Sequence, residues 1–186
     1  MANVATRIAH DGYGMIELNQ VAFRRDGRIE AQCALDPADF SKAAPAENGM
    51  LLVVDQTARK VKLPDAATDK VLINYSAEHM YDERKPGLKN FCLVPGEFLP
   101  RLGYLATGDK FTTNTVSYMK GEETGGYADE AAFWTAVENC GTTAMYGCPC
   151  DNGSILVSTA ADNAVVKVVK KDSMPDGQLG IKFIAL

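Results

Sequence analysis

Three of the five cysteines lie near one another in the sequence, in the order Cys140-x7-Cys148-x-Cys150. A structural zinc site needs about four donors, and such sites usually present their thiolates as Cys-x2–4-Cys pairs. The Cys148–Cys150 pair is one residue too tight for that spacing, and the remaining cysteines, Cys33 and Cys92, stand alone. The pattern favours free thiols, and it leaves open whether Cys140, Cys148 and Cys150 bind a metal.

The chain has only two histidines, His10 and His79, and both lie in segments with the composition of loops. A cysteine nucleophile needs an imidazole within hydrogen-bond reach of its thiol. Cys148 or Cys150 with His79 is therefore the arrangement that a thiol enzyme would use. We favour the interpretation that both histidines lie at the surface, and the sequence assigns no catalytic, cofactor-binding or metal-ligating residue.

Adjacent acids occur at Asp82-Glu83 and at Glu122-Glu123, both in loop-like segments. A glycosidase needs two carboxylates that flank a sugar bond, whereas adjacent acids in a loop are typical of a solvated tip. Segments 108–112 and 151–153 lack the residue order of a phosphate-binding loop and the alternating ligands of a calcium loop. We interpret both segments as turns.

Length and composition favour one globular domain with a sizeable core, because the 186 residues are 46% hydrophobic and 23% charged. The longest apolar run, 50–54, is far shorter than the roughly 18 residues that span a bilayer. The N-terminus has no apolar run behind a basic start, so we expect no export signal. The odd number of cysteines then fits a reducing compartment, and we expect no membrane partner.

The net charge is −5, and the basic residues are scattered or occur as pairs at 24–25, 59–60 and 170–171. Sequence-independent binding of nucleic acid requires clustered Lys and Arg residues that displace counterions. We therefore expect no nucleic-acid partner, and we interpret these basic residues as solvated strand edges and turn flanks.

The clearest structural signal is the segment 49–64. The apolar run 50–54 is followed by a polar turn and by an arm, 60–63, in which basic and apolar residues alternate up to Pro64. This pattern predicts a β-hairpin whose first strand is buried on both faces and whose second strand has one face in water.

Further strands are predicted wherever short apolar or alternating runs lie between turn residues. Segment 21–25 is expected to pair with 28–35 across Asp26-Gly27, a strong hairpin signal because both turn positions can need positive φ. Another pair is expected between 101–106 and 111–116 across Gly108-Asp109. The remaining predicted strands are 13–18, 70–75, 90–94, 154–158 and the pair 164–171 with 178–186.

One short helix is predicted at 129–140. The segment starts with Asp129, carries Phe133, Trp134 and Val137 at helical spacing, and stops at Gly141. The aromatic residues could form a stacking platform for a sugar or a base, but neighbouring aromatics on a helix place at least one ring in the core.

The sum predicts a mainly β, single-domain β-sandwich or β-barrel with one short α-helix, spanning 13–186. Residues 1–12 are weakly patterned and are candidates for an N-terminal arm that orders on a neighbour. Long loops are expected at 76–90 and 117–128.

Segments 47–55, 60–64, 101–114 and 176–183 resemble virion proteins of tailed bacteriophages, in particular small head decoration or cement proteins. The likeness lies in the sequence pattern of the turn and strand segments, and head fibres and tail components share this pattern. The resemblance implies a non-enzymatic viral structural protein on the outside of a capsid. It also implies the major capsid protein as partner, a homo-oligomer or symmetric multicopy array, and a place in the virion after assembly in the host cytoplasm.

Two other functions stay open at this point. The first is a β module that binds carbohydrate or a host surface through loop aromatics such as Tyr81, Tyr118 and Tyr127. The second is the thiol enzyme described above, which would need a reactive thiolate with a lowered pKa.

Overall fold

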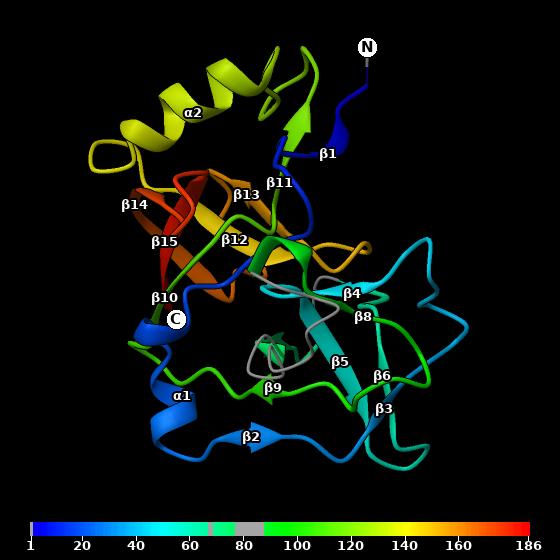
Figure 1. The fold of residues 1–186 in the computed structure, drawn as a ribbon. Helices are drawn as coiled ribbons and strands as arrows, with labels where there is room; N and C mark the ends of the chain where they lie inside the picture. Colours follow the sequence, from blue (N-terminus) through cyan, green and yellow to red (C-terminus); the bar gives the residue numbers. More distant parts are fainter. Residues whose placement is uncertain (1, 67–68, 77–87) are drawn as a thin grey trace.

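The computed structural model describes residues 2–66, 69–76 and 88–186 of the chain. The fold is mainly β, with 34% strand and 12% helix. The strands of these residues form sheets of seven, six and two strands, arranged as two main sheets with a small one between them (Figure 1). The predicted mainly β class with sandwich-like sheets is confirmed, and the sheets do not close into a barrel.

The seven-stranded sheet contains the first and the last strand, β1 and β15. Among the described residues its only parallel neighbours are β11 and β13, and all its other pairs are antiparallel. In spatial order the strands are β1 (Val4–Arg7), β11 (Val116–Lys120), β13 (Ile155–Ser158), β12 (Tyr146–Pro149), β14 (Val166–Ser173), β15 (Leu179–Ala185) and β10 (Lys110–Thr113).

The six-stranded sheet is built from shorter strands around the predicted hairpin. In spatial order these are β2 (Ile29–Glu30), β9 (Leu102–Gly103), β7 (Leu72–Asn74), β5 (Leu51–Asp55), β6 (Lys60–Lys62) and β3 (Ala34–Leu35). The two-stranded sheet pairs β4 (Ala46–Glu47) with β8 (Cys92–Leu93). Two 3-10 turns, η1 (Leu18–Gln20) and η3 (Leu88–Asn90), lie between these elements.

The hairpin of β5 and β6 is confirmed. Leu51 and Leu52 are both buried, and they belong to two different clusters of the core. The first half of β5 is thus buried on both faces, as its apolar run predicts, while its last three residues are partly exposed. The predicted pair of β14 and β15 is also confirmed, and β7, β8 and β13 lie within their predicted segments.

The hairpin predicted around Asp26-Gly27 is wrong. Residues Ala22–Arg25 form a short helix, α1, and Gly27 follows it with a φ of 70°. The Arg28 N–H donates to the Phe23 carbonyl over 3.0 Å, a bond typical of a helix end closed by a left-handed residue. A hairpin turn and a helix end therefore share the same local signal, because both need a residue with positive φ.

Several other predictions about strands are also wrong. Segments 101–106 and 111–116 do not pair, since β9 pairs with β2 and β7 while β10 pairs with β15 in the other sheet. Segment 13–18 contains only a single bridge, Ile16 to Thr113. Part of the expected loop at 117–128 belongs to strand β11, and strand β12 was not predicted.

The helix predicted at 129–140 is confirmed as α2 (Glu130–Glu138). The Asp129 side chain accepts a hydrogen bond from the Ala132 N–H over 2.8 Å, which caps the first turn. Phe133, Trp134 and Val137 are buried against the seven-stranded sheet. The aromatic residues therefore pack in the core and do not form a stacking platform.

Part of the candidate N-terminal arm lies within the fold of this chain. Val4–Arg7 forms β1, which pairs antiparallel with β11 at one edge of the seven-stranded sheet. The following segment then reaches β10, where the Glu17 N–H donates to the Thr112 carbonyl over 2.8 Å. Whether this segment also orders on a neighbouring subunit stays a prediction.

Within the described residues, no helix has both the length and the apolar character that crossing a membrane requires.

Candidate functional site beside the Arg7–Glu47 ion pair

A buried polar junction joins the two main sheets. The Asn74 side chain donates to the Glu47 carbonyl over 2.8 Å, and the Thr115 hydroxyl donates to the Asn48 carbonyl. Thr113 donates to the Met15 carbonyl over 2.5 Å. These bonds connect the β4–β5 segment, β7 and the β10–β11 connection, so the buried polar groups specify how the sheets meet.

The most strongly held charge in this junction is Glu47. Its two carboxylate oxygens each accept an N–H from the Arg7 guanidinium over 2.7 Å, the planar bidentate geometry that arginine favours. One of these oxygens also accepts the Gly14 N–H over 2.5 Å. The Glu47 side chain is only 9% exposed, so the ion pair is desolvated mainly on the carboxylate side.

The pKa values in the junction follow from these contacts. Burial alone would raise the pKa of Glu47, but the hydrogen bonds and charge of Arg7, with the Gly14 N–H, outweigh the effect of burial, so the pKa of Glu47 is lowered.

The pKa of His10 is lowered by burial and by the nearby Arg7 charge, against smaller effects from Glu47, Gly12 and Glu130. His10 Nε2 lies 3.1 Å from an Arg7 nitrogen, and Nδ1 lies 3.0 Å from the Gly12 carbonyl. A neutral ring that accepts from Arg7 and donates to Gly12 fits both contacts.

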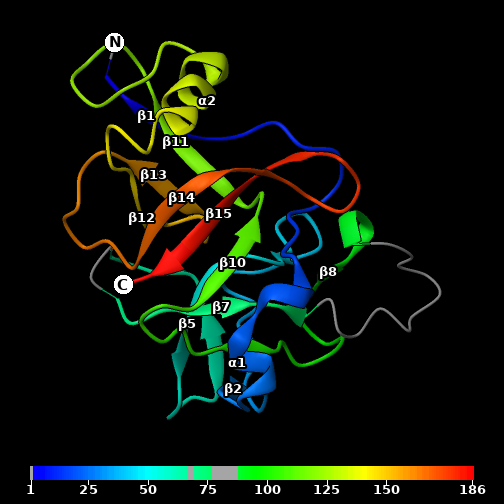
Figure 2. The ribbon, with the colours of Figure 1, turned by 90° about the vertical axis from the view of Figure 1, so that its left-hand side faces the viewer.

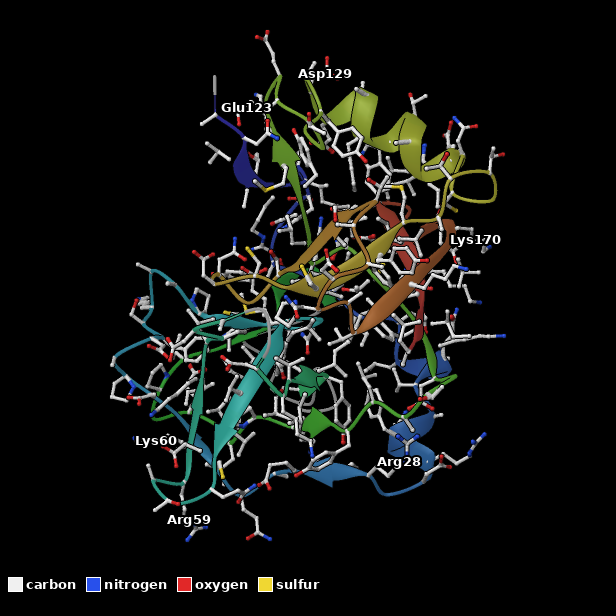
Figure 3. The ribbon with its side chains drawn as sticks, turned by 180° about the vertical axis from the view of Figure 1, so that it is seen from behind. Arg28, Arg59, Lys60, Glu123, Asp129 and Lys170 are labelled. Carbon is white, nitrogen blue, oxygen red and sulfur yellow. The ribbon has the colours of Figure 1, made fainter. Side chains whose placement is uncertain are left out.

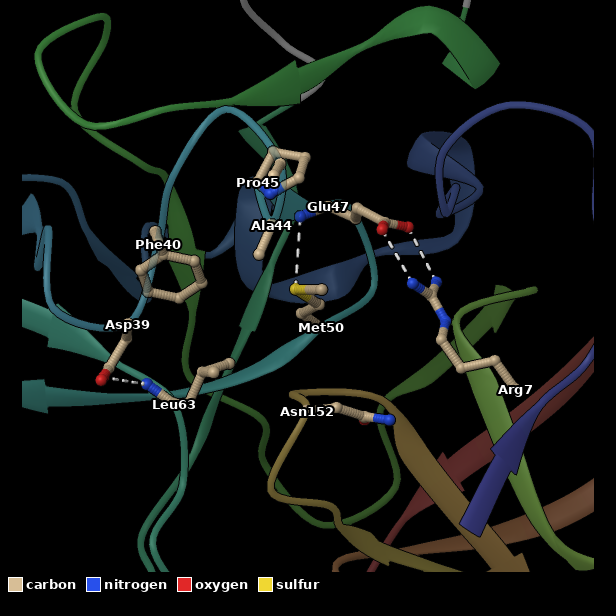
Figure 4. A pocket seen from close by; sticks show the side chains of 10 residues that line it. Arg7, Asp39, Phe40, Ala44, Pro45, Glu47, Met50, Leu63 and Asn152 are labelled. Carbon is tan, nitrogen blue, oxygen red and sulfur yellow. Dashed lines mark hydrogen bonds and ion pairs between the residues drawn. The ribbon is translucent and has the colours of Figure 1, made fainter.

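A shallow cavity of about 270 Å³ opens beside the ion pair (Figure 4). Arg7 and Glu47 form one side of it, while Asp39 and Asn152 provide its other polar groups. Asp39 accepts the Leu63 N–H over 2.9 Å, and the Asn152 side-chain oxygen accepts the Ser154 N–H over 2.9 Å. The rest of the wall is apolar: Phe40, Ala43, Ala44, Pro45, Met50 and Leu63.

The chemistry available at this cavity is limited by how its polar groups are bonded. Both oxygens of Glu47 are occupied by Arg7, and its pKa is lowered, so the carboxyl group is poorly placed to act as a general acid near neutral pH. The apolar part of the wall leaves room for a small apolar group.

The cysteines contact separate groups. Cys140 Sγ lies 3.4 Å from the Val169 carbonyl, Cys148 Sγ lies 3.8 Å from the Leu156 carbonyl, and Cys150 Sγ lies 3.3 Å from an Asp151 oxygen. All five cysteines lie within the described residues, and no disulfide joins any of them. Within residues 2–66, 69–76 and 88–186, no three side chains of His, Cys, Asp or Glu gather closely enough to hold a metal ion.

Burial raises the pKa of both the Cys148 and Cys150 thiols. A catalytic cysteine needs the opposite shift, because the thiolate is the nucleophile. His79, the proposed partner of these thiols, lies outside the described residues. The contacts and the raised pKa values both describe ordinary structural thiols.

The other predicted site residues are dispersed. Tyr118 is buried and stacks on Phe133 with ring centroids 5.0 Å apart, and Tyr127 meets the same ring edge-on at 5.5 Å. The Tyr118 ring is therefore not available as a loop platform for a sugar, and Tyr127 is partly buried against the same core cluster. Glu122 and Glu123 are exposed, as predicted, and Tyr81 and Asp82-Glu83 lie outside the described residues.

The Arg7–Glu47 pair was not predicted from the sequence. The two residues are 40 positions apart and neither lies in a motif. The only local signal is Gly14, because a Cβ added at this glycine would lie 2.8 Å from a Glu47 oxygen. Such a close approach cannot be recognised before the fold is known.

Comparisons with known protein families, with curated proteins and with solved structures find no match to this chain.

Proposed function

We propose that this chain is a non-enzymatic viral structural protein that attaches to the outside of a tailed-phage capsid and stabilises it. Its partner is the major capsid protein, and it occurs in the virion as an oligomer or symmetric array of many copies. The resemblance of segments 47–55, 60–64, 101–114 and 176–183 to head decoration proteins supports this proposal.

The observation that carries the proposal is the open edge of β1. This strand ends the order of the seven-stranded sheet, and no strand within the described residues pairs with its other side. The Ile8 N–H bonds the Val116 carbonyl, and the pairing continues with Thr6 opposite Tyr118. In an antiparallel ladder, hydrogen-bonded pairs alternate with pairs that do not bond each other. The backbone N–H and C=O groups of Ala5 and Arg7 therefore point away from β11, toward the open edge.

The side chains beside this edge also suit contact with protein. Val4 is 62% exposed. A cavity of about 260 Å³ adjoins it, lined by Ala2, Val4, Thr6, Lys120, Gly121, Glu122 and Ala128. An extended segment of a neighbouring subunit can pair with such an edge and place a side chain in the adjoining cavity. A modest contact of this kind becomes strong when many symmetric copies engage together.

Cosedimentation tests the proposed function. The purified protein is mixed with shells assembled from the major capsid protein of the same virus, and the shells are pelleted. We expect saturable binding, with density at symmetric positions on the shell surface in an image reconstruction. Protein that stays in the supernatant at all concentrations, or that locates to tails or fibres in complete virions, would contradict a decoration role.

Substitution of Ala5 by proline tests the role of the β1 edge. Proline removes the N–H that points to the open edge but leaves the ladder to β11 intact, so we expect weaker shell binding from a folded protein. Ala131→Pro in the first turn of α2 is the matched control, because N–H groups there are not needed for the helix. Deletion of residues 2–12 is less informative, since it also removes Arg7 from Glu47.

A further inference from the structure

Four lysines lie on one face of three adjacent strands, β14, β15 and β10. Lys167 is directly opposite Ile184, which is opposite Lys110 on the next strand. In the neighbouring row, Lys170 is opposite Lys182. Residues directly opposite each other point to the same side of a sheet, and so do residues two apart on a strand. We call this group, Lys110, Lys167, Lys170 and Lys182, the lysine face.

The lysine face points away from the core. The other side of the same strands carries Phe111, Val168 and Phe183, which are all buried, and α2 packs on that side. Lys110, Lys167 and Lys170 are exposed, and Lys182 is partly exposed. Figure 2 shows the three strands at the front of the molecule, and Figure 3 shows Lys170 at its periphery.

This concentration of positive charge is unexpected in a chain of net charge −5. Lys170 and Lys182 face each other directly, and like charges in that position destabilise a sheet. Two acids lie near them. Asp172 forms an ion pair with Lys170 over 3.3 Å. Glu17 lies next to Thr112, at the end of the row that contains Lys170 and Lys182, and its carboxylate accepts the Asn19 N–H over 2.9 Å. Four lysines against two acids leave the face positively charged.

The face also offers apolar contact area. Ile184 lies between Lys167 and Lys110 and is partly exposed. Val169, at the irregularity between Val168 and Lys170, is 41% exposed. Basic and apolar side chains in alternation match a protein surface that carries both carboxylates and apolar groups. A phosphate backbone offers no partner for the apolar residues, and the negative charge of the whole chain opposes its approach.

We propose that the lysine face is a docking surface for an acidic protein surface, which charge complementarity selects as its partner. The partner surface belongs to the capsid shell, and this identification rests on the proposed function. Docking places carboxylates between Lys170 and Lys182, where they relieve the repulsion within the pair. The face and the β1 edge are then two separate contact regions of one protein.

A labelled peptide of twelve alternating Glu and Leu residues tests the docking surface without a capsid. Its binding to the full chain is measured by fluorescence anisotropy at low and at high salt, and mapped by amide chemical shifts. We expect shifts concentrated in β10, β14 and β15, and affinity that falls as salt rises.

Two triple variants with the same change of charge make the test specific. Lys110→Gln, Lys167→Gln and Lys170→Gln together remove most of the face. Lys42→Gln, Arg59→Gln and Lys60→Gln together are the control, and Figure 3 shows Arg59 and Lys60 far from Lys170. We expect the first variant to bind the peptide about tenfold more weakly and the control to change less than about twofold. Circular dichroism and thermal unfolding check that both variants are folded.

Three results would overturn the proposal. The first is equal peptide binding by the two triple variants. The second is a labelled DNA duplex that binds the face more tightly than the peptide, which would make the partner a nucleic acid. The third is salt-sensitive self-association lost only in the first variant, which would make the partner a second copy of this chain. Wild-type protein that binds the peptide but not the shells would contradict the proposed function and leave the docking surface intact.

Discussion

Arg7 and Glu47 form two N–H···O bonds of 2.7 Å each, although they are 40 residues apart in the chain. The pair joins β1, at the edge of the seven-stranded sheet, to β4 in the two-stranded sheet. Glu47 is the only charged residue among the buried side chains within residues 2–66, 69–76 and 88–186. The pair therefore links the open sheet edge to the rest of the fold through one desolvated contact.

Arg7→Met should lower the free energy of unfolding by about 3 kcal/mol, because it leaves the Glu47 carboxylate buried without its cation. Urea denaturation at pH 7 measures this change. The double variant Arg7→Met with Glu47→Met should recover part of the loss, since no unpaired charge then remains. A loss below about 0.5 kcal/mol in the single variant would show that the pair contributes little, as exposed pairs do.

Stability should fall in two steps as the pH is lowered. The pKa of His10 lies below its ordinary 6.5 in the folded protein, so the unfolded chain takes up this proton first and stability decreases as the pH falls below 6.5 toward the folded pKa. The pKa of Glu47 is also lowered, so its contribution is complete above its ordinary 4.5 and is lost at lower pH.

His10→Gln separates these two steps, because glutamine does not titrate. Denaturation midpoints of this variant should stay level between pH 6.5 and pH 5, where those of the wild type decline, and both proteins should lose stability below pH 4.5. Parallel curves for the two proteins above pH 5 would remove His10 as the cause of the first step.

Gly49→Ala should destabilise the protein much more than Gly108→Ala. Both glycines have positive φ, 84° and 92°, so an alanine at either site costs about 1 kcal/mol in backbone strain. At Gly49 the added Cβ would lie 2.1 Å from the Thr113 hydroxyl oxygen, whereas nothing lies within 4 Å at Gly108. We expect a further loss of about 2 kcal/mol or more at Gly49 in thermal or urea unfolding.

Lys182→Glu should stabilise the isolated protein by about 0.5 kcal/mol, because it replaces the repulsion opposite Lys170 with an attraction. Lys120→Glu, opposite Val4 on the exposed part of β11, is the control and should give no gain. The gain from Lys182→Glu should shrink in high salt. If both variants behave alike, the two lysines do not repel each other measurably.

Cys148 and Cys150 should react slowly with iodoacetamide at pH 7, because burial raises the pKa of both thiols and lowers their thiolate fraction. Mass spectrometry of the native and the urea-unfolded protein gives the two rates. Faster alkylation of either thiol in the native protein would indicate an activated cysteine and would favour a thiol enzyme.

The elements that were predicted correctly depend on residues close together in the chain. The hairpin of β5 and β6 follows from an apolar run, a polar turn and an alternating arm. Helix α2 follows from Asp129 before an apolar face at helical spacing. In both cases the periodicity of apolar residues and the terminating residues carry the information.

Tertiary packing decided the case of Asp26-Gly27, where the local signal is shared by a hairpin and a helix end. Phe23 is buried, with its ring 4.9 Å from that of Tyr75. A Cβ on Gly103 would lie 2.3 Å from the Phe23 ring, so the missing side chain on β9 makes room for it. Neither Tyr75 nor Gly103 is near Phe23 in the sequence, and the helix could not be predicted without them.

By itself, the sequence determined the mainly β class, the positions of β5, β14 and β15 and the helix α2, because alternation and helical spacing are properties of neighbouring residues. Only the tertiary structure brought Arg7 to Glu47 and aligned Lys170 with Lys182. Both relationships depend on which strands pair and in which register. That choice is made by the burial of whole strand faces against distant partners, and a shift of one residue would turn every side chain to the other face.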